Sequence, residues 1–289
     1  MGEEVVVKQL TRVPGGKAGN VAVAASRLLG PNHVAILGGL GKDSIASDQM
    51  RIFELDGVVT SGLKFTSDHE SGQAYIVIDE RGENIIHTYF GANASVEPED
   101  LDEPGRRSLI AKAQVIALID PPFETALRLA QKGKKLKKLV AWDPGVISQL
   151  ALQKVKPLLE NVDYVVANEV EIHNLSKTTD IDAAANLLNQ VNSELKIITK
   201  LGARGCLMHS GKVRKEFDAL DLMSLGMKVV NTVGCGDAFL GAFVAALSEG
   251  RSDSEAVRWG CCAGGLKATS VETRGSPNRK TLFKYLISA

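Results

Sequence analysis

Short, nearly continuous apolar runs alternate with amphipathic stretches along most of the chain. The apolar runs predict strands at residues 33–37, 115–119, 139–142, 164–167, 196–199 and 206–209. The amphipathic stretches predict helices at residues 18–29, 44–55, 123–131, 181–191 and 237–248. Apolar strands separated by helices are typical of a mainly parallel sheet covered on both faces. We therefore expect a three-layer α/β/α fold whose ligands bind beyond the carboxyl ends of the strands.

Two segments depart from this alternation. Residues 72–90 read GQAYIVIDERGENIIHTYF, in which two β-rich runs flank the turn-like stretch DERGEN. Residues 5–13 are also strand-like. Together the two segments predict a small antiparallel sheet that stands apart from the main one.

The charge and the cysteines exclude several classes of protein. The 289 residues contain 34 Lys+Arg and 34 Asp+Glu, and this balance argues against a nucleic-acid binder. The longest apolar run, at residues 239–247, is too short to span a bilayer, and the first residues do not read as a secretory signal. The four cysteines form no C-x-x-C pair, so we expect free thiols in a reducing cytoplasm.

The stretch NTVGCGDAF, residues 231–239, carries the strongest chemical signal. The backbone N–H groups of Gly234, Cys235 and Gly236 would lie at a helix start, where unpaired amides and the helix dipole attract an anion. Asp237 could accept a proton from an attacking hydroxyl. A helix cap with a Gly-rich turn is the alternative, and it accounts for Asp237 but not for both glycines.

A second motif, PGGKAGN at residues 14–20, leads into another predicted helix. Gly15 and Gly16 would allow the backbone to approach a ligand closely. Lys17 and Asn20 offer hydrogen bonds to hydroxyls or phosphates. An ordinary loop-to-helix connection remains the alternative.

Two further motifs follow predicted strands. TKLGARG, with Thr199, Gly202 and Gly205, could cradle nucleotide phosphates, although a simple hairpin accounts for it about as well. In NEVE, Glu171 could hold Mg²⁺ through water, with Asn168 beside it. A solvated carboxylate at a helix start is the alternative for Glu171.

The order of the four motifs resembles that of the PfkB, or ribokinase-like, carbohydrate kinase family. GGKAGNVAVAASRLLG resembles the N-terminal glycine motif of the family, and NTVGCGDAF resembles its C-terminal motif D-T-x-G-A-G-D. NEVE is similar to N-x-x-E, and TKLGARG to T-x-G-x-x-G. The resemblance covers residues 2–277 and is strongest for the ribokinase branch, in which G-E-N and then G-A-N close the lid region, as at 82–84 and 91–93 here.

The resemblance implies a role for each matched residue. Sugar binding is implied for Gly15, Gly16, Lys17, Asn20, Asp120 and Asp237, and Asp120 stands where the branch has a glutamate. Asp237 would be the catalytic base, and the anion hole would be formed by Gly234, Cys235 and Gly236. ATP would contact Asn168, Thr199, Gly202, Gly205 and Gly236, while hydrated Mg²⁺ would be held by Glu171 and Asn168.

Two further departures from the family pattern bear on the site and on the fold. Asn231 replaces the aspartate that helps ribokinases to bind an activating monovalent cation together with a late loop, which corresponds to residues 268–276 here. The lost charge argues against activation by K⁺. The family also has a hydrophobic strand before the glycine motif, ending in a sugar-binding aspartate, whereas Met1 stands where that strand has finished. This strand is therefore absent from this sequence. We hypothesise that the gene product begins further upstream or that another segment fills the gap.

The resemblance implies one kinase domain over residues 1–289, with lid segments at about 3–13 and 72–91. It would transfer the γ-phosphoryl group of ATP to a sugar hydroxyl, with ribose as the first candidate. A nucleoside kinase and a sugar-phosphate kinase of the same family remain alternatives, as does a catalytically weak sugar-binding or regulatory protein. Apolar faces on the small sheet also predict a homodimer through the lid, and neither a nucleic acid nor a membrane is expected as a partner.

Overall fold

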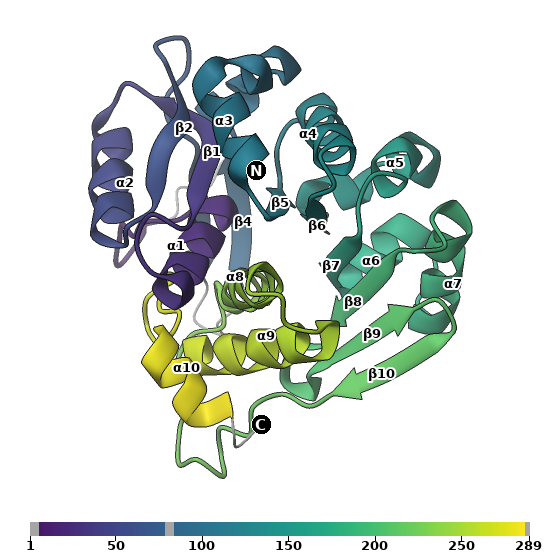
Figure 1. The fold of residues 1–289 in the computed structure, drawn as a ribbon. Helices are drawn as coiled ribbons and strands as arrows, with labels where there is room; N and C mark the ends of the chain where they lie inside the picture. Colours follow the sequence, from purple (N-terminus) through teal and green to yellow (C-terminus); the bar gives the residue numbers. More distant parts are fainter. Residues whose placement is uncertain (1–5, 79–83, 287–289) are drawn as a thin grey trace.

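The computed structural model describes residues 6–78 and 84–286, and Figure 1 shows strands and helices alternating along it. The main sheet is made of β5 (Val115–Ile119), β6 (Leu139–Asp143), β7 (Tyr164–Asn168), β8 (Lys196–Lys200), β9 (Cys206–Ser210) and β10 (Val213–Phe217). Its order is β10-β9-β8-β7-β6-β5. Strands β5 to β8 are parallel, whereas β9 and β10 are antiparallel to their neighbours. The predicted α/β fold is confirmed.

Helices cover both faces of this sheet. The described helices are α1 (Lys17–Leu29), α2 (Ser44–Leu55), α3 (Pro104–Lys112), α4 (Phe123–Lys135), α5 (Leu152–Leu159), α6 (Glu169–Ser176), α7 (Ile181–Val191), α8 (Cys235–Ser248), α9 (Asp253–Ala268) and α10 (Arg279–Leu286). Of these, α2 packs against Ile36 and Leu63, outside the main sheet. Alternate residues of β7 serve the two faces: Tyr164 and Val166 pack in the core with α1, α8 and α9, while Val165 and Ala167 pack in the core with α4, α5 and α7. Among the described helices, none combines the length and the apolar character needed to cross a membrane.

The first two strands of the described chain lie outside the main sheet. β1 (Ala35–Gly41) and β2 (Val59–Thr66) pair in parallel and form a separate two-stranded sheet. Over residues 6–78 and 84–286, no strand joins β1 to β5. The hypothesis of a missing first strand stays a prediction.

The expected small antiparallel sheet is only partly present. β3 (Gln73–Ile78) and β4 (Asn84–Tyr89) form the predicted hairpin, with Tyr75 opposite His87. The predicted strand at 5–13 is wrong for residues 6–13, which have no regular structure and leave Val6, Val7, Leu10 and Val13 exposed. These residues pair with no neighbouring strand, and β-rich side chains alone do not hold a strand in place. Residues 3–5 and the turn residues 79–83 lie outside the described part of the chain.

The close packing of α1 against α8 positions the site. Gly241 faces α1, and a Cβ added there would lie 2.5 Å from the Cβ of Ala24 and 2.9 Å from the carbonyl oxygen of Val21. Only a glycine therefore allows this separation of the two helices. Their N-termini lie close enough for Asn20 of α1 to bond Asp237 of α8.

Replacing Gly241 tests this packing. Gly241→Ala should lower the free energy of unfolding by about 1–3 kcal/mol, because the new methyl group overpacks the interface. It should also reduce kinase activity, since the two helix N-termini separate. Gly105→Ala is the matched control: nothing lies within 4 Å of an added Cβ at Gly105. Equal stability of the two variants in denaturant melts would show that the contact at Gly241 does not set the helix separation.

Candidate active site

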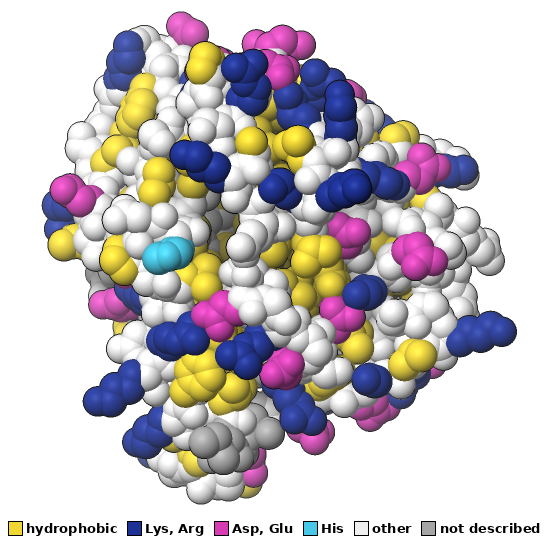
Figure 2. Space-filling view, viewed as in Figure 1, with side chains coloured by type: hydrophobic (Ala, Val, Ile, Leu, Met, Phe, Trp, Pro, Cys, Tyr) yellow, Lys and Arg dark blue, Asp and Glu magenta, His cyan; other side chains and the backbone are white. Residues whose placement is uncertain are grey.

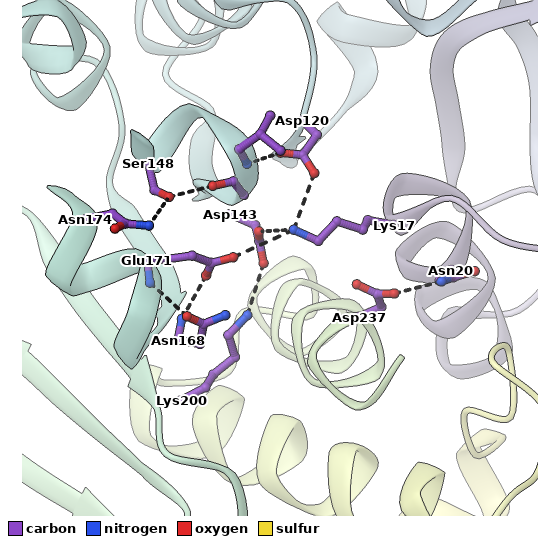
Figure 3. A network of polar contacts seen from close by, with 12 residues as sticks. Lys17, Asn20, Asp120, Asp143, Ser148, Asn168, Glu171, Asn174, Lys200 and Asp237 are labelled. Carbon is purple, nitrogen blue, oxygen red and sulfur yellow. Dashed lines mark hydrogen bonds and ion pairs between the residues drawn. The ribbon is translucent and has the colours of Figure 1, made fainter. Parts of the chain in front are cut away.

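Polar side chains from four parallel strands meet at one edge of the main sheet. Asp143, Asn168 and Lys200 are the last residues of β6, β7 and β8, and Asp120 follows β5. Figure 3 shows them converging with Lys17 and Glu171. Figure 2, which has the same view as Figure 1, shows a hollow near the middle of the molecule. This edge is where parallel α/β sheets bind ligands.

Asp143 is the buried centre of this cluster. Its side chain accepts a hydrogen bond from Lys17 Nζ at 3.0 Å through Oδ1 and from Lys200 Nζ at 3.0 Å through Oδ2. Lys17 Nζ also lies 3.4 Å from Asp120 Oδ2 and 3.8 Å from Glu171 Oε1. The ammonium of Lys17 thus connects the glycine motif at the start of α1 with three carboxylates at the edge of the main sheet.

The electrostatics of the cluster follow from burial and pairing. Burial opposes the charge of Asp143, but Lys200 and Lys17 outweigh it and hold the pKa of Asp143 below its usual range. Burial would also lower the pKa of Lys17, yet Asp143, Asp120 and Glu171 together raise it. The pKa of Glu171 is raised by burial first and then by the nearby charge of Asp143.

Asn20 and Asp237 connect the N-terminal turns of α1 and α8. Asn20 Nδ2 donates to Asp237 Oδ2 at 2.7 Å (Figure 3). Burial raises the pKa of Asp237, the hydrogen bond from Asn20 lowers it, and the charge of Asp143 raises it; the balance is a raised pKa. A carboxylate with a raised pKa accepts a proton more readily near neutral pH.

The loop before α8 has the shape expected of an anion site, with one difference. Gly234 has φ +89, and a Cβ there would collide with the carbonyl oxygen of Thr273. Within the described residues, no acceptor is bonded to the amides of Gly234 and Gly236, but Cys235 N donates to Thr232 O at 3.2 Å. The Cys235 amide is therefore engaged in the loop's own turn. Burial raises the pKa of the Cys235 thiol, which argues against a reactive thiolate.

The glycine motif before α1 is open. A Cβ at Gly15 or Gly16 would meet nothing within 4 Å, and Gly16 has φ +87 at the helix start. Asp120 lies across from this motif, and its Oδ1 accepts from the amide of Val146 at 2.9 Å. The backbone of Gly15 and Gly16 therefore has open space beside it.

The third motif is arranged differently from its prediction. Thr199 is fully buried, and its hydroxyl has no hydrogen-bond partner, so this side chain does not line the site. Thr199 stands three residues before Gly202, whereas T-x-G requires two, and Lys200 occupies that position instead. A Cβ at Gly236 would lie 3.5 Å from Lys200 Nζ, so the ammonium is beside the loop of α8.

The two glycines of that motif also differ from each other. Gly202 has open space around it, whereas a Cβ at Gly205 would collide with the carbonyl oxygen of Phe217. Gly202 is therefore accessible to a ligand, and Gly205 is required by the fold.

Asn168 and Glu171 form a capping box at the start of α6. Asn168 Oδ1 accepts from Glu171 N at 2.8 Å, and Glu171 Oε2 accepts from Asn168 N at 2.8 Å. Only Oε1 of Glu171 points toward the cluster of Lys17. No group of three or more His, Cys, Asp or Glu residues in the described chain is arranged to hold a metal directly.

Sequence reasoning missed three residues of the site: Asp143, Lys200 and Arg274. The position of Asp143 at the end of a buried strand was a usable signal, as was that of Lys200. Arg274 had no signal, because it comes from a loop after α9. It is buried, and its Nε donates to Asn20 Oδ1 at 3.0 Å while Nη2 donates to Gly15 O at 2.7 Å. Arg274 therefore turns the amide nitrogen of Asn20 toward Asp237.

The fold and this site define a phosphotransferase that acts on small polar substrates, and the comparisons identify its family. Residues 1–280 match the model of the pfkB family carbohydrate kinases. A ribokinase of Lactococcus lactis is 30% identical over 275 residues, covering 95% of this chain and 85% of the relative. The chain belongs to the pfkB family and is an ATP-dependent carbohydrate kinase.

Solved structures agree with this assignment. The crystal structure of a ribokinase from Thermotoga maritima has a TM-score of 0.86 and 28% identity, covering 99% of this chain and 92% of the other. A ribokinase of Arabidopsis thaliana in complex with ribose and ATP has a TM-score of 0.85 and 23% identity, covering 99% and 91%. The second likeness supports the fold.

The pairing of Asp143 with two lysines predicts a pH-dependent stability. Asp143→Asn should lower the free energy of unfolding near pH 7 by about 2 kcal/mol, less than the loss of about 3–5 kcal/mol for fully buried pairs, because Lys17 stays partly exposed. The depressed pKa means that this stabilisation is complete above the unfolded-state pKa of about 4 and is lost as pH falls through the folded-state pKa.

Melting temperatures of both proteins near pH 7 and about pH 3 check this expectation. The difference in melting temperature between the parent protein and Asp143→Asn should be smaller at the lower pH. Asp218→Asn, at an exposed carboxylate, is the control and should show no such difference. A difference that stays constant with pH would contradict the charge pairing.

Proposed function

We propose that this protein is a ribokinase, which transfers the γ-phosphoryl group of ATP to a hydroxyl of ribose. The observation that carries the proposal is the bond between Asn20 and Asp237, because it joins a hydroxyl-binding motif to a buried carboxylate of raised pKa. The similarity to the ribokinases of L. lactis and T. maritima supports ribose as the substrate.

In this proposal, the two helix N-termini divide the work. Gly15, Gly16, Lys17 and Asn20 bind the sugar hydroxyls, and Asp120 reaches in from the opposite side. Asp237 takes the proton from the attacking hydroxyl, while the amides of Gly234 and Gly236 stabilise negative charge at the start of α8. Cys235 lies between these two glycines. For its amide to join the anion hole, the hydrogen bond from Cys235 N to Thr232 O must break.

ATP supplies the phosphoryl group, and the residues present fit its polyphosphate. Gly202 offers open backbone, and Lys200 carries a positive charge beside Gly236. Gly205 holds the turn, and Asn168 fixes the start of α6. Hydrated Mg²⁺ suits Glu171 Oε1, which is free of the capping box and faces the cluster. The whole chain acts as one kinase domain in the cytoplasm, with β3 and β4 as its lid.

A sugar-phosphate kinase fits the site less well. Such an enzyme needs spare cations near the sugar to bind the second phosphate. Lys17 is already surrounded by Asp143, Asp120 and Glu171. Arg274 Nε and Nη2 already donate to Asn20 and Gly15, although its buried Nη1 has no partner. This pairing favours a neutral sugar.

Asp237→Asn tests the assignment of the base. Phosphoryl transfer to ribose should fall by at least about 10²–10⁴-fold, because an amide cannot accept the proton. ATP binding, measured by calorimetry, should be largely retained. Asp48→Asn, at an exposed carboxylate of α2, should leave both quantities unchanged. Equal turnover by Asp237→Asn and the parent protein would rule out this base.

We also propose a homodimer through the β3–β4 hairpin. Apolar side chains are exposed on both of its faces, including Tyr75, Val77, Ile85 and Ile86. A paired hairpin this apolar is normally covered by a partner. The two-fold symmetric contact of a dimer would cover it.

Light scattering of the purified protein tests the dimer. The parent should have twice the chain mass, and Ile85→Glu should shift it to a monomer, because a charge cannot be buried in the contact. Met223→Glu is the control, since Met223 is 87% exposed and lies far along the chain from the hairpin. A monomeric parent protein at working concentration would exclude the dimer.

A further inference from the structure

A fully buried lysine lies beneath the loop that leads into α8. Lys267, one residue before the end of α9, has 0% exposure. Its Nζ donates to the carbonyl oxygens of Asn231 at 2.9 Å and Ser270 at 3.4 Å. No carboxylate among residues 6–78 and 84–286 lies within 4.0 Å of this ammonium. A buried charge solvated by carbonyl dipoles alone is costly, so its retention calls for a reason.

The two carbonyls belong to the two loops that shape the anion site. Asn231 opens the segment that reaches Gly234, and Ser270 opens the loop that reaches Thr273, against which Gly234 packs. Asn231 makes two further hydrogen bonds between the loops. Its backbone N donates to Ala268 O at 3.1 Å, and its side-chain Nδ2 donates to Val271 O at 2.8 Å. Lys267 is the charged donor among the hydrogen bonds that connect the two loops.

Backbone carbonyl oxygens directed at one positive charge, as the two at Lys267 are, are also the ligands that proteins give to a monovalent cation. The resemblance to ribokinases implies such a cation between these same two loops. The residues here do not fit one. Asn231 is uncharged, its side-chain amide nitrogen is turned toward Val271, and its carbonyl oxygen already accepts from Lys267.

We propose that the Lys267 ammonium replaces the monovalent cation, so that the kinase is independent of K⁺. Lys267 is a positioning residue: it holds the two loops together and supplies a fixed positive charge below the start of α8, where Asp237 and the amides of Gly234 and Gly236 act. Burial lowers the pKa of Lys267, and Asp237 and Cys235 oppose that shift. This inference rests on the proposed kinase function for its activity readout only.

The experiment compares salts at equal ionic strength. Ribose phosphorylation by the full chain is measured in choline chloride and in KCl, with Mg²⁺ and ATP saturating. The parent protein should change by less than about twofold, since screening is matched and no cation site is open. Strong activation of the parent by KCl over choline chloride would overturn the proposal.

Lys267→Ala supplies the second arm. It leaves the carbonyls of Asn231 and Ser270 unpaired and creates room for an ion. Turnover in choline chloride should fall by about 10-fold to 100-fold through misplacement of the loop, and KCl or NH₄Cl should restore part of it. Lys228→Ala, at an exposed lysine just before the same loop, should behave like the parent in every salt.

Thermal melting separates this inference from the proposed function. KCl should raise the melting temperature of Lys267→Ala relative to choline chloride and leave that of the parent unchanged, whether or not ribose is the substrate. A variant with parent-like activity and no salt-specific shift would overturn the inference. If no sugar is phosphorylated but the melting response is as expected, the cation replacement stands and the ribokinase proposal fails.

Discussion

The closeness of α1 and α8 is the constraint on which the rest of the site depends. Gly241 permits it, and the alanine-rich faces on either side fill the interface without side chains that would push the helices apart. The consequence appears about one turn away along each helix, where Asn20 of α1 meets Asp237 of α8. Two helix starts that are distant in sequence thereby share one ligand space. Packing in the core, rather than any loop, sets the geometry of the chemistry.

The second organising feature is the balance of charge around Asp143. Two ammonium groups approach one buried carboxylate, and two further carboxylates stand near Lys17. Neither lysine is therefore a free cation in the protein without ligands. Substrate recognition on the sugar side then depends on hydroxyl hydrogen bonding more than on charge, which agrees with a neutral sugar. Arg274 Nε and Nη2 also donate within the protein, to Asn20 and to the backbone of Gly15, whereas its buried Nη1 has no partner.

The sequence predicted most of the fold and the main parts of the site. Continuous apolar runs such as 164–167 identify buried parallel strands because nothing else buries both faces. β2 was missed because Gly62 and its polar neighbours interrupt the apolar pattern, and α9 because its glycines weaken a helical signal. The strand expected at 5–13 failed for the opposite reason. Its composition is right, but a strand also needs a neighbour, which no local pattern contains.

The errors in the site have the same origin. Thr199 was matched to a motif although it stands one residue too far from Gly202, and strand alternation turns it inward and presents Lys200 at the edge. Arg274 and Lys267 could not be found from the sequence, because their roles depend on loops that come together only in the folded chain. The sequence showed that Asn231 lacks the negative charge of the family's aspartate. Lys267, whose ammonium we propose replaces the monovalent cation, lies 36 positions further along the chain.

The division of the sheet between β1 and β5 has a consequence for how the protein behaves in concentrated solution. Within the described residues, β1 pairs only with β2 and β5 only with β6, so each of these strands has one edge without a strand partner. Such edges are templates for strand addition by another chain. The net charge of zero provides little mutual repulsion between molecules, so it would not oppose such strand addition in concentrated solution.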